Sequence, residues 1–164
     1  MIDPHENEQY RSGLEAAIAK QLQKQEARYT YEDFKIPFIY PERSALYLPD
    51  FLLGNGIIIE AKGQFTTADR KKMKLVKQAN PDLDIRFVFN NPNALISKRS
   101  TTSYAKWCTD HGFKYAKGLI PPEWIEEKYN PVTTEAVRKL YHQNTLRNAE
   151  QRKRKRQEQE ATND

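Results

Sequence analysis

Apolar residues near the start of the chain recur at helical spacing. Leu14, Ile18 and Leu22 lie four residues apart, so they form one stripe of a helix that we expect to continue to about Arg28. The segment Ser12-Gly13-Leu14-Glu15 has the serine and the acid of a capping box, which predicts that the helix begins there. The chain therefore opens, after its first ten residues, with an amphipathic helix.

The next fifty residues have the composition of β-strands. The expected strands are Tyr29 to Tyr40, with an irregularity at Pro37, then Ala45 to Leu53 and Ile57 to Lys62. A break over Pro41 to Ser44 separates the first two. Gly54-Asn55-Gly56 predicts a hairpin between the last two, because glycine accepts positive φ. Three consecutive isoleucines indicate that the third strand is buried on both faces.

The rest of the chain alternates between helical and strand patterns, which predicts an α/β fold. The expected elements are a helix from Thr66 or Thr67 to Ala79, a strand from Asp84 to Phe89, a helix from Tyr104 to His111, a short strand from Phe113 to Ala116, a helical turn at Pro121 and one polar helix from about Thr133. In the first of these helices, Met73, Val76 and Ala79 should face inward. Its basic residues should lie on the outer surface.

Length and composition restrict the class of protein. A chain of 164 residues with 38% hydrophobic residues fits one domain with a tail. It has no apolar run long enough to cross a membrane, and its polar, acidic first residues are not those expected of a secretory signal. The single Cys108 excludes a disulfide scaffold and favours a reducing cytoplasm. We find no phosphate-binding or dinucleotide loop, so no small-molecule cofactor is expected. The net charge of +5 favours a polyanionic partner such as nucleic acid.

One pattern carries candidate chemistry. Pro49-Asp50 is followed, after nine intervening residues, by Glu60-Ala61-Lys62. Residues two apart on a strand point the same way, so Glu60 and Lys62 share a face, and the hairpin can return Asp50 to their neighbourhood. Two carboxylates suit Mg²⁺, and a nearby lysine can orient or deprotonate water or stabilise a phosphate. The pattern favours metal-assisted phosphodiester hydrolysis.

Simpler interpretations exist for the same residues. Asp50, Glu60 and Lys62 could form a solvated polar face, although an unpaired charge in an apolar strand would cost several kcal/mol. Glu15 is explained by helix capping alone. The basic side chains around Arg70-Lys71-Lys72 and Lys74 could be a solvated face or could contact DNA phosphates.

Ten segments in order resemble the bacteriophage endonuclease I family. They are Arg11-Ser12-Gly13-Leu14-Glu15, Tyr31-Glu32, Lys35-Ile36-Pro37, Pro49-Asp50-Phe51-Leu52-Leu53, Asn55-Gly56-Ile57, Glu60-Ala61-Lys62-Gly63, Asp69-Arg70-Lys71-Lys72, Leu83-Asp84-Ile85-Arg86, Thr102-Ser103-Tyr104, and Leu119-Ile120-Pro121 with Glu123-Trp124-Ile125. This family comprises Holliday-junction resolvases of the PD-(D/E)xK nuclease superfamily. The resemblance covers about residues 10 to 126.

The resemblance implies a restriction-endonuclease-like mixed sheet flanked by helices, in an intertwined homodimer. Residues 10–130 would form the nuclease domain, of which 10–40 would exchange between subunits, and 131–164 would form a basic helical extension. Asp50, Glu60 and Lys62 would act in one subunit together with Glu15 of the other. Two Mg²⁺ ions, replaceable by Mn²⁺, would be held by Asp50, Glu60, the Ala61 carbonyl and Glu15. The enzyme would nick opposing strands of four-way and other branched DNA in the host cytoplasm during phage infection.

The sequence departs from the family pattern at both ends. The family's leader can be basic, whereas Asp3, Glu6 and Glu8 make this one acidic. The extension, with its basic run Arg152 to Arg156, has no counterpart in the resemblance. We therefore expect Arg152, Lys153 and Arg154, with the basic cluster of the second helix, to contact DNA. A sequence-preferring nuclease and a non-catalytic nucleic-acid binder are the competing functions.

Overall fold

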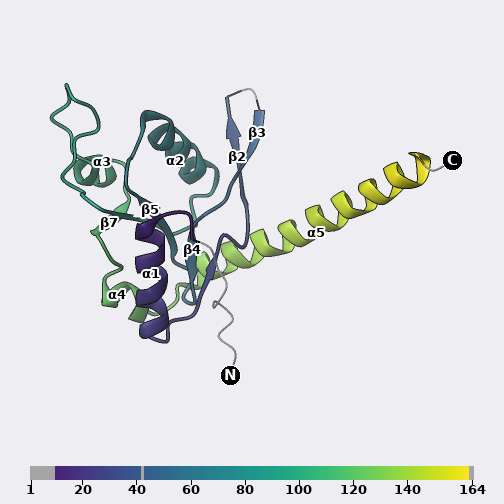
Figure 1. Ribbon diagram of the computed structural model, residues 1–164, viewed down its shortest axis with the longest axis horizontal. Helices are drawn as coiled ribbons and strands as arrows, with labels where there is room; N and C mark the ends of the chain where they lie inside the picture. The colour runs from purple at the N-terminus through teal and green to yellow at the C-terminus, as the bar shows by residue number, and fades with distance from the viewer. Residues whose placement is uncertain (1–9, 42, 163–164) are drawn as a thin grey trace.

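The computed structural model describes residues 10–41 and 43–162 of the chain (Figure 1). Its elements, in order, are α1 (Gly13–Lys24), β1 (Tyr29–Tyr31), β2 (Ile36–Tyr40), β3 (Arg43–Tyr47), β4 (Phe51–Leu53), β5 (Ile58–Lys62), α2 (Thr67–Ala79), β6 (Ile85–Phe89), α3 (Tyr104–Asp110), β7 (Lys114–Lys117), α4 (Pro122–Glu126) and α5 (Pro131–Thr162). The acidic leader residues Asp3, Glu6 and Glu8 lie outside the described residues. Within the described part of the chain, no helix is long and apolar enough to cross a membrane.

A mixed sheet with the strand order β1-β4-β5-β6-β7 forms the centre of the fold. The β1–β4 and β4–β5 pairs are antiparallel, whereas β5, β6 and β7 run parallel. The predicted α/β class is thus confirmed, with a sheet that is mixed as expected. Strands β2 and β3 form a separate two-stranded hairpin in which Ile36 pairs with Tyr47.

Each face of the sheet carries its own apolar core. Helices α1 and α4 cover one face, where Ile18 and Trp124 pack with Ile59 of β5. On the opposite face, Met73 of α2 and Trp107 of α3 pack with the other side of β5 and β6. As predicted, β5 is buried on both faces because its successive isoleucines alternate between the two cores.

Two predicted strands are each divided in the structure. The segment from Tyr29 to Tyr40 forms β1 in the main sheet and β2 in the hairpin, joined by residues 32–35. Likewise, the segment from Ala45 to Leu53 is divided into β3 and β4, and β3 begins at Arg43, inside the break expected over Pro41 to Ser44. The prediction of one continuous strand in each place was wrong, because the hairpin leaves the plane of the main sheet. Helix α1 also ends at Lys24, short of the expected Arg28.

The turn between β4 and β5 uses its two glycines differently. Gly56 has a φ of +90°, as the prediction required. Gly54 does not share this conformation within the described residues, and its role is steric: a Cβ atom there would lie 2.9 Å from the Cβ of Arg28. The expectation that both glycines adopt positive φ was therefore wrong for Gly54.

Helix α2 has the predicted bounds but a different buried face. Thr66 caps it in a capping box with Asp69, and Met73 and Val76 are buried. Arg70, expected on the outer surface, is also buried, since its guanidinium donates to the Phe65 carbonyl (2.5 Å) and to Thr67 Oγ1 (2.9 Å). Ala79, expected inside, is exposed. Both side-chain placements were wrong: the acceptors at Phe65 and Thr67 allow the Arg70 guanidinium to be buried, and Ala79 at the end of the helix lies at the surface.

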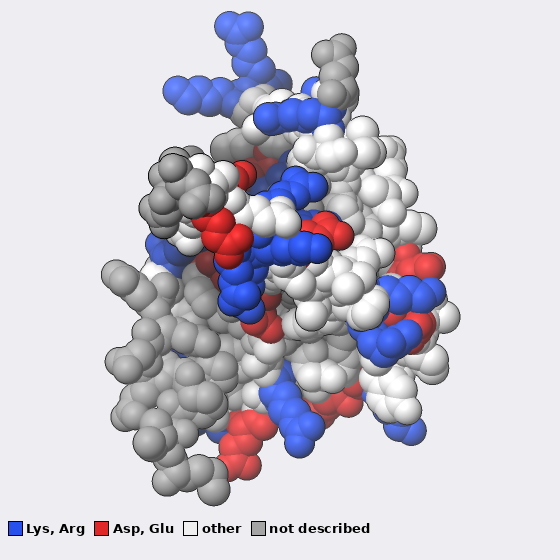
Figure 2. All heavy atoms as spheres, turned by 90° about the vertical axis from the view of Figure 1, so that its right-hand side faces the viewer, with Lys and Arg blue, Asp and Glu red and all other residues white. Residues whose placement is uncertain are grey.

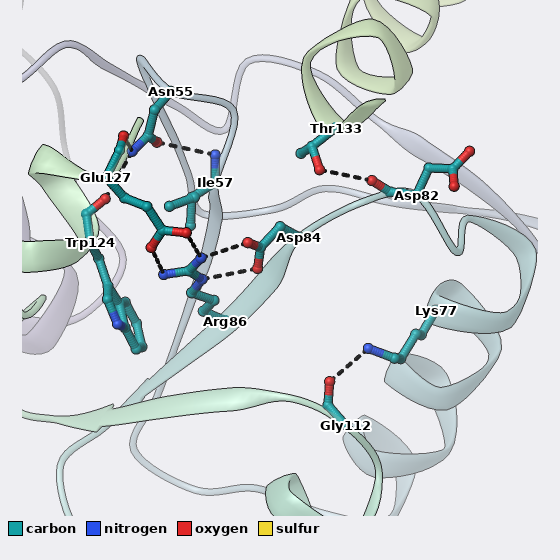
Figure 3. Close-up of polar contacts among 10 residues, drawn as sticks. All are labelled: Asn55, Ile57, Lys77, Asp82, Asp84, Arg86, Gly112, Trp124, Glu127 and Thr133. Atoms are coloured by element: carbon teal, nitrogen blue, oxygen red, sulfur yellow. Dashed lines mark hydrogen bonds and ion pairs between the residues drawn. The ribbon is translucent and has the colours of Figure 1, made fainter. Parts of the chain in front are cut away.

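A buried arginine ties α4 to the sheet (Figure 3). Arg86 of β6 is fully buried and forms ion pairs with Asp84 (2.6 Å) and Glu127 (2.8 Å), and it lies over the Trp124 ring. Asn55 in the β4–β5 turn donates to the carbonyls of Trp124 and Glu127. These contacts fix the chain just before α5 begins.

Helix α5 starts on the body and then projects away from it (Figure 1). Val137 and Leu140 lie in the core on the α2 face. Tyr141 stacks on Phe34, and the Asn144 side chain bonds both the backbone N–H and the carbonyl of Lys35. Beyond residue 147 the helix is exposed. The predicted long polar helix is confirmed, and its first turns form part of the core.

Candidate active site

The turn at Gly54-Asn55-Gly56 brings Asp50 next to β5, as predicted from the sequence. Phe51 pairs with Ile59, and the Asp50 Oδ2 atom accepts the backbone N–H of Ala61 at 2.7 Å. Glu60 and Lys62 project from the same face of β5, because they are two residues apart. The structure therefore brings Asp50 next to the Glu60-Ala61-Lys62 segment.

Both carboxylate oxygens of Glu60 have a defined partner. The side chain is almost fully buried, with 3% of its surface exposed. Its Oε2 atom accepts the hydroxyl of Tyr47 at 2.5 Å, and its Oε1 atom lies 3.1 Å from the Lys62 Nζ atom. The Lys62 ammonium thus balances the charge of Glu60 at one oxygen atom, and the neutral Tyr47 hydroxyl donates a hydrogen bond to the other.

Lys62 lies between two carboxylates. Its Nζ atom is 3.3 Å from Asp69, the capping-box residue of α2, as well as close to Glu60. Burial by itself would lower the pKa of Lys62, but Glu60 and Asp69 more than offset this effect, so the pKa is raised. In this arrangement Lys62 is an ammonium group that can stabilise negative charge, and it is a poor proton acceptor.

Asp50 is in the opposite situation. Burial is the largest cause and the charge of Glu60 the next, and together with Glu15 they raise the pKa of Asp50 to about 8. The Ala61 N–H and Lys62 act in the other direction but do not compensate. A half-buried carboxylate with this excess of neighbouring negative charge is suited to hold a cation.

Glu15 is both a capping residue and a neighbour of Asp50. Ser12 caps α1 by accepting the Glu15 N–H, and the Glu15 carboxylate accepts the Ser12 hydroxyl (2.7 Å) and the Arg11 N–H (3.2 Å). The Tyr31 hydroxyl donates at 2.5 Å to Oε2, the same Glu15 oxygen that accepts the Arg11 N–H, whereas Ser12 donates to Oε1. Oxygen atoms of Glu15, Glu32 and Asp50 lie within 4.8 Å of one another, a spacing that could hold a metal ion. In this structure Glu15 and Asp50 belong to the same chain.

Glu32 is a member of this group that the sequence patterns did not single out. It has a φ of 45°, unusual for a residue with a side chain, and its N–H donates to the Asp50 carbonyl at 2.9 Å. Its carboxylate pairs with Arg11 at 2.9 Å. The only signal in the sequence was its place in the segment Tyr31-Glu32, which resembles the family but has no motif spacing to Asp50.

The basic residues predicted to contact DNA fall into three groups. Arg70 is buried, as described above, and is not available at the surface. Lys71 and Lys74 are exposed on α2, and Lys72 is half-buried with its Nζ atom 5.3 Å from the Tyr47 ring centre. Arg152, Lys153 and Arg154 are exposed on the projecting part of α5. Figure 2 shows that the face toward which α5 projects mixes basic and acidic side chains.

Known proteins resemble this chain over most of its length. A family model described as Phage endonuclease I matches residues 3–144. Endonuclease I of Escherichia phage T7 is 42% identical over 130 residues, which cover 79% of this chain and 87% of that protein. Endodeoxyribonuclease 1 of Enterobacteria phage T3 is 46% identical over 118 residues, covering 72% and 78%. The match to the family model stops before the projecting part of α5.

Proposed function

This chain belongs to the phage endonuclease I family, and on that basis we propose that it is a metal-dependent endodeoxyribonuclease that resolves branched DNA. Its substrates would be four-way (Holliday) and other branched junctions, in which it nicks opposing strands in the cytoplasm of an infected bacterium. The observation that carries the proposal is the convergence of Asp50, Glu60 and Lys62, with Glu15 beside them.

The donor set fits Mg²⁺ or Mn²⁺, and we infer two ions in each site. Asp50, Glu60 and Glu15 would hold them, together with the backbone carbonyl of Ala61, because hard cations prefer oxygen ligands. The raised pKa of Asp50 supports this fit, since a cation would offset the negative charge that causes it. When bound, such ions supply a nucleophilic water and polarise the phosphate.

The chain's own residues would prepare the phosphate for attack. The Lys62 ammonium, kept protonated by Glu60 and Asp69, would stabilise the negative charge that develops on the phosphate. Exposed Lys71 and Lys74 with Lys72 on α2, and Arg152, Lys153 and Arg154 on α5, would neutralise backbone phosphates.

The first test replaces one carboxylate. Glu60→Ala should abolish Mg²⁺-dependent nicking of a four-way junction, because it removes a metal ligand, and junction binding in Ca²⁺ should persist. Cleavage of radiolabelled junctions and of a matched linear duplex in Mg²⁺ measures nicking, and a gel shift of the junction in Ca²⁺ measures binding. The exposed Glu123→Ala variant is the control and should cut at the wild-type rate. Wild-type rates for Glu60→Ala would contradict the proposal, and equal cutting of the linear duplex would favour a sequence-preferring nuclease.

We also propose that the active unit is a homodimer that exchanges residues 10–40. Strands β2 and β3 pair as a separate hairpin, with the turn between Tyr40 and Arg43. Opening this turn would carry α1, β1 and β2 to a second chain, where the contacts of Glu15 with Asp50 could re-form between subunits. The same local geometry would then be made from two chains.

A mixing experiment tests the exchange. Glu15→Ala and Glu60→Ala chains, refolded together, should form heterodimers in which one site has neither substitution. These heterodimers should nick one strand of a junction, whereas each homodimer alone should be inactive. If Glu15 acts within its own chain, every site in the heterodimer carries one substitution, and purified heterodimers should stay inactive.

A further inference from the structure

We propose that Tyr47 is a positioning residue that fixes the Glu60 carboxylate for metal binding. This inference rests on the proposed function and adds to it a residue for which the motif spacing gives no signal. Tyr47 is the last residue of β3, three residues before Asp50. One short segment would therefore supply Asp50 as a ligand and also hold the second ligand in place.

The contact between the two side chains is buried at both ends. Tyr47 is 2% exposed and Glu60 is 3% exposed, and the phenol hydroxyl lies 2.5 Å from the Glu60 Oε2 atom. Water therefore has little access to replace this donor. Because Lys62 occupies the side of Oε1, the two contacts together define the rotation of the carboxylate.

Tyr47 is itself held firmly by its surroundings. It pairs with Ile36 across the hairpin and belongs to the apolar core that includes Met73. The Lys72 ammonium lies over its ring, 5.3 Å from the ring centre. Because packing already fixes the Tyr47 ring, its hydroxyl can hold the Glu60 carboxylate without a further loss of side-chain freedom.

The phenol also remains a donor at working pH. The ordinary pKa of a tyrosine hydroxyl is about 10, so the phenol is neutral at neutral pH. A neutral donor orients Glu60 without cancelling the negative charge that a metal ion needs. Partners of metal ligands that act in this way commonly change metal affinity or activity by about 10–100-fold when they are removed.

The test removes only the hydroxyl. Tyr47→Phe should raise the Mg²⁺ concentration for half-maximal junction cleavage, and weaken Mn²⁺ binding measured by calorimetry without DNA, by about 10–100-fold. Tyr104→Phe is the matched control: Tyr104 is also buried in this core, and its hydroxyl accepts the Phe65 N–H away from the carboxylates. It should leave both metal measurements unchanged.

Two further variants keep the test decisive. Tyr47→Met also lacks the donor but packs differently, so it should show the same metal shift and replaces Tyr47→Phe if that variant fails to fold. In a Glu60→Ala background, Tyr47→Phe should weaken Mn²⁺ binding no further, because the residue acts through Glu60. Wild-type metal dependence in a folded donorless variant would overturn the role of Tyr47. Absence of any metal-dependent cleavage in the wild-type protein would instead overturn the proposed function.

Discussion

Asp50 shows how one residue of the candidate active site can lower the stability of the folded protein. Its pKa of about 8 lies well above the usual value near 3.9, so the folded protein without metal binds this proton more tightly than the unfolded chain does. The free energy of unfolding must then fall as the pH rises from about 4 through about 8. Active-site groups commonly carry such a cost.

Replacing Asp50 should remove this pH dependence. In EDTA at pH 9, Asp50→Asn should raise the free energy of unfolding by roughly 1–3 kcal/mol relative to wild type, with little difference near pH 4. Urea denaturation at both pH values measures this change. The exposed Asp82→Asn is the control, for which the difference from wild type should not vary with pH. Parallel curves for Asp50→Asn and wild type would show that Asp50 is not the group responsible.

For individual residues of the candidate site, the sequence predicted correctly those whose positions depend on local spacing along the chain. Asp50, Glu60 and Lys62 converge because a tight turn joins β4 and β5, and that turn is visible in the sequence. Glu32 could not be found in this way, because it reaches Asp50 only through the pairing of β1 with β4 and a positive φ. Arg70 was misplaced because a hydrophobicity pattern treats every arginine as a surface residue, whereas this guanidinium binds a backbone carbonyl.

Among the elements, α4 depends on one charged contact with β6. Glu127 lies directly after α4 and pairs with the fully buried Arg86, which lowers the pKa of the Glu127 carboxyl. Hydrogen bonds to charged groups contribute about 1.5–3 kcal/mol when buried, but water screens this pair because the Glu127 side chain is 43% exposed. Asp84 remains as a second partner of Arg86 when Glu127 is removed.

Glu127→Ala should therefore lower the free energy of unfolding by roughly 0.5–1 kcal/mol at pH 7, because water screens a pair whose carboxylate is 43% exposed. Because the pKa of Glu127 is lower in the folded state, this contribution is present above the unfolded value near 4.3 and is lost as the pH falls below it. Thermal denaturation at pH 7 and pH 3 measures both effects. The exposed neighbour Glu126→Ala should change little, and an equal loss in the two variants would contradict a specific role for Glu127.

The strands show why element boundaries were harder to predict than element types. The alternation of residues 29–40 is that of a strand throughout, but its two halves belong to different sheets. The hydrophobic pattern does not mark the change, which coincides with the positive φ of Glu32 and with contacts of Asp33 and Lys35 to α5, more than a hundred residues away in the chain. By contrast, α2 and α3 were predicted closely, since Thr66 and Ser103 cap them through local hydrogen bonds.

For the whole molecule, the projecting part of α5 is the main feature outside the family match. Residues 147–162 would extend about 24 Å as a helix. Residues 147–164 carry six basic and four acidic side chains. Because this segment is exposed and has little apolar surface, a solubilising role is the alternative to DNA binding.

Truncation after Leu146 should separate these roles. If the projecting part of α5 contacts phosphates, its removal should weaken junction binding. The slope of log affinity against log salt concentration should then flatten by about 0.9 for each lost contact. Cleavage at saturating enzyme should change little, because Tyr141 and Asn144 remain. Replacing Arg152, Lys153 and Arg154 with Gln in the full chain is the matched test of charge alone. An unchanged salt slope in both the truncated protein and the Gln-substituted protein would favour a solubilising role for the projecting part of α5.

The docking of α5 on Asp33 and Lys35 also has a consequence for the order of assembly during synthesis. The Tyr141 hydroxyl donates to Asp33, and Asn144 holds the backbone of Lys35. Since α5 follows the other described elements in the chain, these contacts cannot form until all of those elements have left the ribosome. The segment that links β1 to β2 is therefore secured last. Under the exchange proposed above, residues 10–40 of a nascent chain can dock either on its own body or on that of a neighbour on the same polysome until α5 emerges.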